Sequence, residues 1–468
     1  MISPTSGVEK ALLSDLAGKL DPDGELFLIP YLDGYIFSAP RLDTAALIDT
    51  SLALALREGV ATDGLQSELL LTLAGRLAFP DSWRDLISRR PEKVTWKPST
   101  VIFSNTQKCT LRCTYCYADG GRLDDADIDP VVAEAAIDLV IRNAVEISSR
   151  PGLVFIGEGE ATANWDGFTH IVDYFRSECI RHYLEPFVSL CTNGVFSKTK
   201  VPYIAENCDS LAFSIDGLPR AHDAHRVLPN GNGSFGLVAA TLCEFDRLNK
   251  SYAIWSTATR VGASLMTEFV QWIGESTLCR EVHIDPVFDM AGLSKTTEYS
   301  ECLDGAEFVD AYRRSRRVAA NFGISLVYSP ADDGKRTSFC GAANASNFLV
   351  TSKGLVTSCN EVLRSDDPRA GLFQYGAWNP ETSRFEFDTA AIGKLAKLNV
   401  HEIPKCQGCF AKYNCAGDCY ARSSNGGADP WAGTYTARCG ITRELLKDKI
   451  MLSLLQSGTP GPVGASAG

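Results

Sequence analysis

The stretch Ser104-Asn-Thr-Gln-Lys-Cys109-Thr-Leu-Arg-Cys113-Thr-Tyr-Cys116 decides the fold, and it begins at the end of an apolar run, 101–104, that predicts a β-strand. Three cysteines within eight residues allow one loop to hold one small metal cluster. Thiolates are soft ligands that suit iron–sulfur clusters or zinc. Because only three are local, a four-iron cubane bound here would keep one iron open for an exogenous ligand.

Outward from this loop, short strand-like runs alternate with longer helical patterns. Strands are expected at 101–104, 153–156, 187–191, 210–215, 254–259 and 282–286. Helices are expected at 130–147, 167–183, 234–248, 265–276 and 304–322. This alternation predicts an α/β fold with a parallel sheet and crossover helices. Six units are too few to close as the eight-unit barrel does, so the predicted shape is an open, partial (β/α)6 barrel.

Two other regions flank the barrel. Residues 25–38 predict two strands around an Asp33-Gly34 turn, and 43–57 and 64–77 predict helices, which together make a small N-terminal α+β unit. The other flank is rich in cysteine and ends in a predicted helix at 437–455. The predicted parts of the chain are 1–95 (N-terminal unit), 96–330 (barrel), 331–455 (cysteine-rich domain) and 456–468 (disordered tail).

Composition narrows the class of protein. The 468-residue chain has 45% hydrophobic and 22% charged residues, as soluble globular proteins do. Its net charge of −12 disfavours nucleic acid and anionic membranes as partners. Residues 1–20 lack the order of a signal peptide, and no apolar run reaches the ~18 residues of a membrane span. We therefore expect a cytoplasmic protein, in which sixteen cysteines indicate metal binding rather than disulfides.

The Cys-x3-Cys-x2-Cys loop after the first strand resembles the radical S-adenosylmethionine (SAM) superfamily. The resemblance implies that Cys109, Cys113 and Cys116 hold a catalytic [4Fe–4S] cluster whose open iron binds SAM. It also implies that Tyr115 lies beside the adenine. A structural zinc knuckle with a distant fourth ligand is the alternative.

A second segment, Gly157-Glu-Gly-Glu160, follows the second predicted strand and resembles the Gly-Gly-Glu-Pro segment of that superfamily. The resemblance implies that Gly159 and Glu160 hold the SAM amino group. The match departs at Glu158, where glycine is usual, and at Ala161, where proline is usual. Glu158 is therefore a competing candidate for the ligand.

Two more segments lie at the ends of the third and fourth predicted strands. They resemble the Thr-Asn-Gly and Ser-x-Asp-Gly…His-Asp-x-x-Arg segments of the peptide-modifying branch of the superfamily. The resemblance implies that Asn193, Ser214, Asp216 and Arg226 contact SAM. Barrels of this type place their sites at the carboxyl ends of strands, so the positions agree with a shared site.

A second cysteine group resembles the SPASM domain, which holds two auxiliary [4Fe–4S] clusters. Its members are Cys340, Cys359, Cys406, Cys409, Cys415, Cys419 and Cys439. The resemblance assigns four to an outer cluster, namely Cys406, Cys409, Cys415 and Cys439. The other three, Cys340, Cys359 and Cys419, go to an inner cluster, whose fourth position is left to another residue or to a substrate. A zinc ribbon is the alternative.

SPASM-bearing enzymes mostly modify peptides, so the resemblance implies a maturase of a ribosomally made precursor peptide, with an oxidative crosslink as product. Its implied partners are a leader-bearing precursor peptide and a low-potential electron donor of the flavodoxin or ferredoxin type. One alternative is a sulfatase maturase that makes formylglycine, although Asn360 stands where that subfamily has its aspartate base. Another is a dehydrogenase of a small molecule. Glu361 is the predicted catalytic base, with Glu158 and Asp289 as other candidates.

The N-terminal unit bears on the choice between these functions. Two strands followed by helices roughly match a recognition element for leader peptides, which adds the peptide as a strand to a sheet edge. The alternative is a subdomain that caps the open side of the barrel. A binding-only scaffold is the other class of function, and failure to form 5′-deoxyadenosine would establish it.

Overall fold

The computed structural model describes residues 26–39, 44–58, 96–122, 125–287, 304–332, 334–423 and 437–456. Three predictions lie outside the described residues: the helix at 64–77, the candidate base Asp289, and all but the first residue of the tail at 456–468.

One curved sheet of eleven strands organises the molecule, in the order β10-β9-β8-β7-β6-β5-β4-β11-β12-β13-β14. The six predicted barrel strands are present and parallel: β4 (Thr100–Phe103), β5 (Gly152–Phe155), β6 (Phe187–Thr192), β7 (Ser210–Ser214), β8 (Ala253–Ala258) and β9 (Glu281–Pro286). A seventh parallel strand, β10 (Ser325–Val327), pairs with β9. It was not predicted, because three residues carry too little periodicity. The α/β partial barrel is confirmed.

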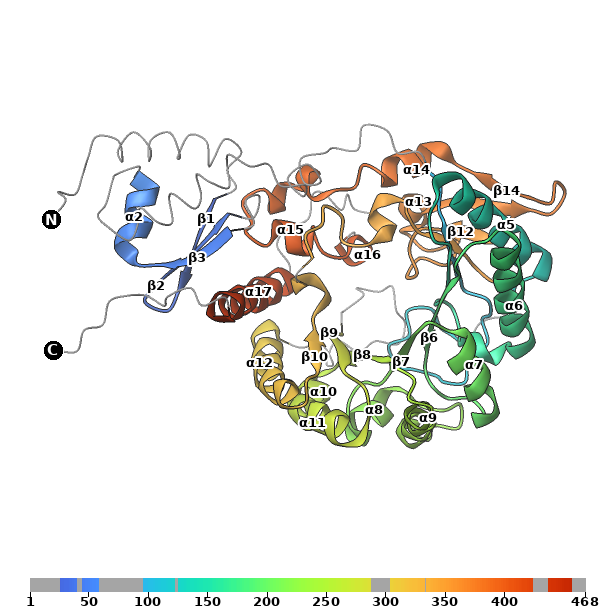
Figure 1. Ribbon diagram of the computed structural model, residues 1–468, viewed down its shortest axis with the longest axis horizontal. Coiled ribbons are helices and arrows are strands. Elements are labelled where there is room, and N and C mark those ends of the chain that lie inside the picture. Colours follow the sequence, from blue (N-terminus) through green and yellow to red (C-terminus); the bar gives the residue numbers. More distant parts are fainter. Residues whose placement is uncertain are drawn as a thin grey trace.

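Helices line the outer side of this sheet (Figure 1). They are α5 (Pro130–Ile147), α6 (Trp165–Arg181), α7 (Val201–Asn207), α8 (Pro219–His225), α9 (Phe235–Arg247), α10 (Arg260–Ser264), α11 (Met266–Ser276) and α12 (Gly305–Asn321). Helix α5 has the predicted bounds because Asp129 caps it, accepting a hydrogen bond from the Val131 amide, and Pro130 opens it. The short helices α7, α8 and α10 were not predicted, since each has two turns at most.

The sheet runs past the predicted boundary at residue 330 into the cysteine-rich domain. Strand β11 (Phe348–Val350) pairs in parallel with β4, on the edge opposite β5. Antiparallel strands continue the sheet: β12 (Leu355–Thr357), β13 (Gln374–Asn379) and β14 (Arg384–Phe387). Among its short helices are α14 (Thr389–Leu395), α15 (Lys412–Cys415) and α16 (Tyr420–Ser423), and it ends in α17 (Ala437–Gln456). The barrel and this domain therefore share one sheet.

The N-terminal unit contains the predicted hairpin, β1 (Phe27–Tyr31) and β2 (Gly34–Ala39). The predicted helix at 43–57 is wrong in its first part, because β3 (Thr44–Ile48) pairs with β2 and only then does α2 (Thr50–Glu58) begin. Asp49 ends the strand by accepting a hydrogen bond from the Leu52 amide at the start of that helix.

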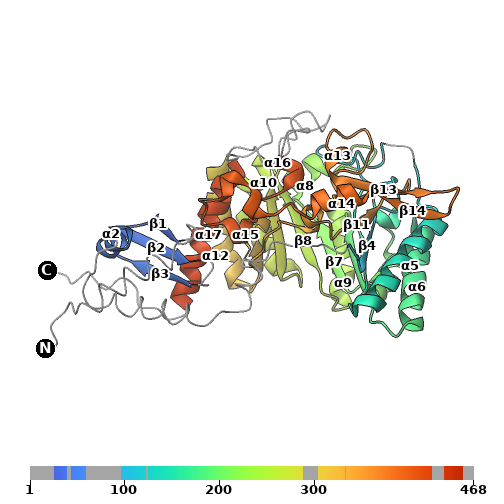
Figure 2. The same ribbon diagram turned by 90° about the horizontal axis from the view of Figure 1, so that it is seen from above.

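Both views place this unit beside α17, away from α5 and α6 (Figures 1 and 2). Ile29 and Ile36 of the small sheet form a core with Met451 of α17, so the hydrophobic contact is direct. Among the described residues, no helix is long and apolar enough to cross a membrane.

Candidate active site

The cysteine loop that follows β4 is held by backbone hydrogen bonds on two sides. The Arg112 amide donates to the Val227 carbonyl at 2.7 Å, and the Thr114 amide donates to the His225 carbonyl at 2.9 Å. On the other side the Glu160 amide donates to the Lys108 carbonyl at 2.9 Å. Gly159 lies so close to that carbonyl that a Cβ there would collide with it. The glycine therefore lets the two loops touch, which agrees with its predicted position.

The three loop thiols lie close together and are partly enclosed. Burial raises the pKa of Cys109 to about 11 and that of Cys113 to about 12. The thiolate of Cys116 contributes to both shifts. A metal cluster would need the thiolate forms, and its binding would release protons.

Glu160 faces this loop from the end of β5. Its Oε1 accepts hydrogen bonds from the hydroxyls of Thr162 and Thr192, and its Oε2 accepts one from the Asn193 amide, all at 2.8 Å. Burial raises the pKa of Glu160. The side-chain amide of Asn193 in turn reaches Cys109 Sγ at 3.7 Å. The structure therefore brings Glu160 and Asn193 together beside the first thiol.

Glu158 is occupied elsewhere. Its carboxylate accepts hydrogen bonds from the hydroxyl of Ser104, the side-chain amide of Gln107, and both the amide and the hydroxyl of Ser352. Only 3% of the residue is exposed. Of the two competing carboxylates, Glu160 lies toward the thiols, whereas Glu158 joins the barrel to the turn after β11.

Three of the other predicted SAM contacts form one cluster. Asp216 Oδ2 accepts hydrogen bonds from the hydroxyl of Tyr115 and from Arg226 Nε, the latter at 2.8 Å, and its Oδ1 accepts one from the Thr257 amide. Burial opposes ionisation of Asp216, but the guanidinium of Arg226, the charge of His222 and the hydrogen bonds to the carboxylate together lower its pKa. The guanidinium also lies over the Tyr115 ring, 5.6 Å from its centroid. Asp216 thus holds both the Tyr115 ring and the Arg226 guanidinium in place.

Ser214 ends β7 and starts a row of side chains that cross the sheet. In register with it lies Trp255 of β8, and next to that lies His283 of β9. Ile254 and Ala258, on the other face of β8, are buried in the core, whereas Trp255 is 43% exposed. The row therefore faces the inside of the barrel. Sequence analysis missed Trp255 and His283, although an aromatic residue at an alternate strand position was the available signal.

The four cysteines of the predicted outer cluster gather between α15, the turn that precedes it, and α17. Burial and the neighbouring Asp418 carboxylate raise the pKa of Cys415 well above its usual value. The other members raise it further: Cys406, Cys409 and Cys439. Asp418 forms a two-pronged ion pair with the buried Arg438, at 2.5 and 2.8 Å. This pair ties the start of α17, and with it Cys439, to the loop that carries Cys415.

The three cysteines of the predicted inner cluster also lie together. Burial raises the pKa of Cys359 well above its usual value, and the Glu361 carboxylate and the thiolates of Cys419 and Cys340 raise it further. The backbone amide of Glu361 donates a hydrogen bond to Cys359 Sγ at 3.5 Å. The predicted base therefore lies within the inner cysteine set.

Electrostatic neighbours link Cys415 to Cys406, Cys409 and Cys439, and Cys359 to Cys340 and Cys419. Among the residues that the structure describes, no three His, Cys, Asp or Glu side chains are arranged to hold a single ion.

Comparison with known proteins gives the class of the barrel. Residues 104–242, which include the cysteine loop and strands β5 to β7, match the Radical SAM superfamily. That family implies a [4Fe–4S] cluster and SAM.

Two solved structures have folds similar to that of this chain. The chain resembles anSMEcpe with bound AdoMet and Cp18Cys peptide, with a TM-score of 0.61, 17% identity, and coverage of 77% of this chain and 99% of that one. It also resembles SuiB from Streptococcus suis bound to precursor peptide SuiA, with a TM-score of 0.52, 13% identity, and coverage of 88% and 98%. At 17% and 13% identity, both likenesses show that the fold is shared.

Curated relatives match over a smaller part of the chain. A cysteine-type anaerobic sulfatase-maturating enzyme from Clostridium novyi is 22% identical over 165 residues, which cover 35% of this chain and 44% of the relative. An uncharacterized protein from Methanocaldococcus jannaschii is 27% identical over 177 residues, covering 37% of this chain and 57% of the relative. The chain thus spans about half the length of the curated relatives that it matches.

Proposed function

We propose that this chain is a radical SAM maturase that oxidatively modifies a ribosomally made precursor peptide, with a crosslink as the product. The observation that carries the proposal is the shared sheet. The predicted SAM site follows β4, and the two further cysteine sets belong to the domain that contributes β11, the neighbour of β4. When SAM and the first cluster are bound, reductive cleavage of SAM supplies a 5′-deoxyadenosyl radical that removes a hydrogen atom from the peptide. The residues around that site bind, orient and exclude water.

Each predicted residue of the SAM site has a role in this proposal. Cys109, Cys113 and Cys116 hold the first cluster. Glu160, backed by Asn193, accepts the ammonium group of SAM, for which a buried carboxylate is the natural partner.

The remaining contacts come from the other strand ends. Arg226 meets the SAM carboxylate, and Tyr115 lies against the adenine. Asp216 is a positioning residue for both, because its Oδ2 accepts hydrogen bonds from both side chains. Ser214 marks the row that continues to Trp255 and His283, and this row would line the path of the peptide.

The two auxiliary clusters would accept the second electron of the oxidation. Abstraction of one hydrogen atom leaves a substrate radical, and formation of a crosslink requires that one more electron and one proton leave. The seven cysteines of the second group provide the ligands for that electron sink. A low-potential donor of the flavodoxin or ferredoxin type would supply the electron that cleaves SAM.

The N-terminal unit would bind the leader of the precursor. Strands β1 and β3 each pair with β2 alone among the described strands, so the small sheet has two edges to which an extended peptide could add. The structure of SuiB bound to precursor peptide SuiA is similar over 88% of this chain, which supports a peptide substrate.

A sulfatase maturase is the second candidate, favoured by the likeness to anSMEcpe and to the Clostridium novyi enzyme. Two features weigh against it. Asn360 has no proton-accepting carboxylate at the position where that subfamily places its base. The next residue, Glu361, is held by Arg422 in an ion pair of 2.7 Å.

Co-expression with a short precursor peptide encoded beside this gene, followed by mass spectrometry, tests the proposal. The expected result is a peptide that has lost two hydrogen atoms and shows a new bond between two side chains in its fragmentation. Conversion of a Cys or Ser to formylglycine would favour the second candidate. Unchanged mass with deuterium uptake from solvent would mean epimerisation and would overturn the crosslinking proposal.

A further inference from the structure

The inner cysteine set offers three thiolates to a cluster that has four irons. Cys340, Cys359 and Cys419 are the members, and the resemblance supplies no fourth. The inference below rests on the proposed function in one respect, namely that auxiliary clusters are present.

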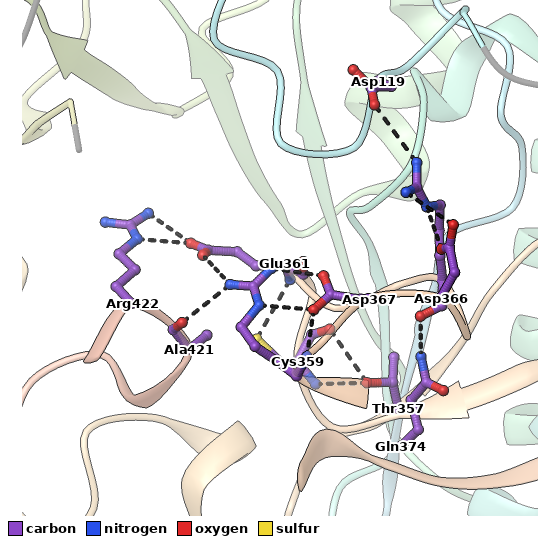
Figure 3. A network of polar contacts seen from close by, with 11 residues as sticks. Asp119, Thr357, Cys359, Glu361, Asp366, Asp367, Gln374, Ala421 and Arg422 are labelled. Atoms are coloured by element: carbon purple, nitrogen blue, oxygen red, sulfur yellow. Dashed lines mark hydrogen bonds and ion pairs between the residues drawn. The ribbon is translucent and has the colours of Figure 1, made fainter. Parts of the chain in front are cut away.

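Glu361 is placed where the missing ligand is needed. It follows Cys359 by two residues, its amide donates to the sulfur of that cysteine, and its side chain is 91% buried, with 9% exposed. Its carboxylate lies between two guanidinium groups, those of Arg422 and Arg369 (Figure 3).

The two oxygens of this carboxylate differ. Oε1 accepts hydrogen bonds from Arg422, at 2.9 Å from Nε and 2.7 Å from the terminal nitrogen. Oε2 is buried and has no hydrogen-bond partner. A terminal nitrogen of Arg369 lies 3.8 Å from Oε2, which is beyond hydrogen-bond distance.

An unsatisfied buried carboxylate oxygen is costly and therefore points to a missing partner. We propose that Oε2 of Glu361 is the fourth ligand of the inner auxiliary cluster. The Arg422 pair then orients the ligand, as hydrogen-bonded groups around metal sites commonly do.

This assignment changes the role that the sequence suggested for Glu361. A carboxylate bonded to iron through one oxygen and to a guanidinium through the other has no site left to take a proton from a substrate. A hard oxygen ligand on a cluster of soft thiolates is also the one that exchanges most readily. The inner cluster would therefore keep one replaceable corner, at which a substrate group could displace the carboxylate.

Three variants of the full-length, anaerobically reconstituted protein test the assignment. Glu361→Gln keeps the size of the side chain but removes the anionic ligand, and Glu361→Cys restores a fourth thiolate. Asp367→Asn is the matched control, because Asp367 bonds to Arg369 at 2.9 Å without belonging to the cysteine set.

The readouts are iron content and electron paramagnetic resonance after mild oxidation. The wild type, Glu361→Cys and Asp367→Asn are expected to keep about twelve irons per chain, whereas Glu361→Gln loses about one and shows a [3Fe–4S] signal. In wild-type protein labelled with carbon-13 glutamate, electron–nuclear double resonance should show a carboxylate coupling to the reduced cluster that Glu361→Gln abolishes.

The outcomes separate the two levels of the proposal. If the wild type holds about twelve irons and Glu361→Gln matches it in iron content and in both resonance experiments, Glu361 is not the ligand, while the auxiliary clusters stand. If the wild type holds only about four irons, the auxiliary clusters themselves are absent and the proposed function fails with them.

Discussion

The hydroxyl of Ser352 donates a 2.8 Å hydrogen bond to Oε2 of Glu158, a residue 194 positions earlier in the chain. Ser352 lies in the turn between β11 and β12, and Glu158 lies in the loop after β5. The contact joins the loop that carries Glu160 to the domain that carries the second cysteine group. Glu158, which departs from the usual glycine of the superfamily, therefore has a structural role that differs from the role of its neighbour Glu160.

The same substitution at Glu158 and at Glu160 should affect different properties, namely stability and SAM affinity. Glu158→Gln places an amide against hydrogen-bond donors, so the free energy of unfolding should fall by roughly 2–3 kcal/mol while SAM affinity stays within about threefold. Glu160→Gln should weaken SAM binding by roughly tenfold or more, because it removes the charged partner of the ammonium group. Denaturant unfolding and calorimetric titration with SAM measure the two quantities. A loss of SAM binding only in Glu158→Gln would reverse the assignment.

Arg438 should be required for the outer cluster. Its removal leaves the buried Asp418 carboxylate without its ion-pair partner, at a cost of roughly 3–5 kcal/mol, and releases the start of α17 that carries Cys439. Arg438→Met is expected to lose about four of about twelve irons.

Arg313→Met is the matched control for this prediction. Arg313 of α12 also pairs with α17, through Asp448 at 2.7 Å, but it lies far from the cysteines in sequence and is 37% exposed. The Arg313→Met variant should keep the full iron content of the wild type. Full iron content in Arg438→Met would show that the Asp418–Arg438 pair does not hold the cluster ligands in place.

His222 should make the stability of the cluster-free protein depend on pH. Burial lowers the pKa of His222 to about 4, because the residue has no exposed surface. The unfolded chain has the ordinary value of about 6.5 and so binds the proton first. Stability is therefore full above about pH 6.5, and roughly 2 kcal/mol should be lost by pH 5. Denaturant unfolding at pH 7 and pH 5 measures the loss, and the same loss in His222→Gln would rule out this residue as its source.

The barrel could be predicted from sequence because its signals are local and repeated. The bounds of strands β4 to β9 differ from the expected ones by at most one residue, and α5 has the expected bounds. Strands of three residues, such as β10 and β11, carry no readable alternation, so the sharing of one sheet by two domains could not be foreseen. The apolar run at 44–48 fits a helix or a strand equally well, and pairing with β2 decided between them.

Parts of the candidate site were predictable for a different reason. Cysteines at fixed spacing and strand-end motifs mark the chemistry whatever the packing, so the sets around Cys109 and Cys406 could be expected. The partners of Glu158, Glu361 and Asp216 come from segments distant in sequence. Only the folded chain shows that one carboxylate joins domains, another lies among the inner cysteines, and the third holds Arg226.

Formation of 5′-deoxyadenosine tests the central claim most directly. Full-length protein, reconstituted with iron and sulfide under anaerobic conditions, is mixed with SAM and a strong reductant, and the nucleoside is quantified by chromatography. The wild type is expected to form it, and the variant with Cys109, Cys113 and Cys116 all changed to Ala is expected to form none while losing about four irons. Formation of 5′-deoxyadenosine by this triple variant at the wild-type rate would contradict the assignment of the first cysteine loop as the site of radical chemistry.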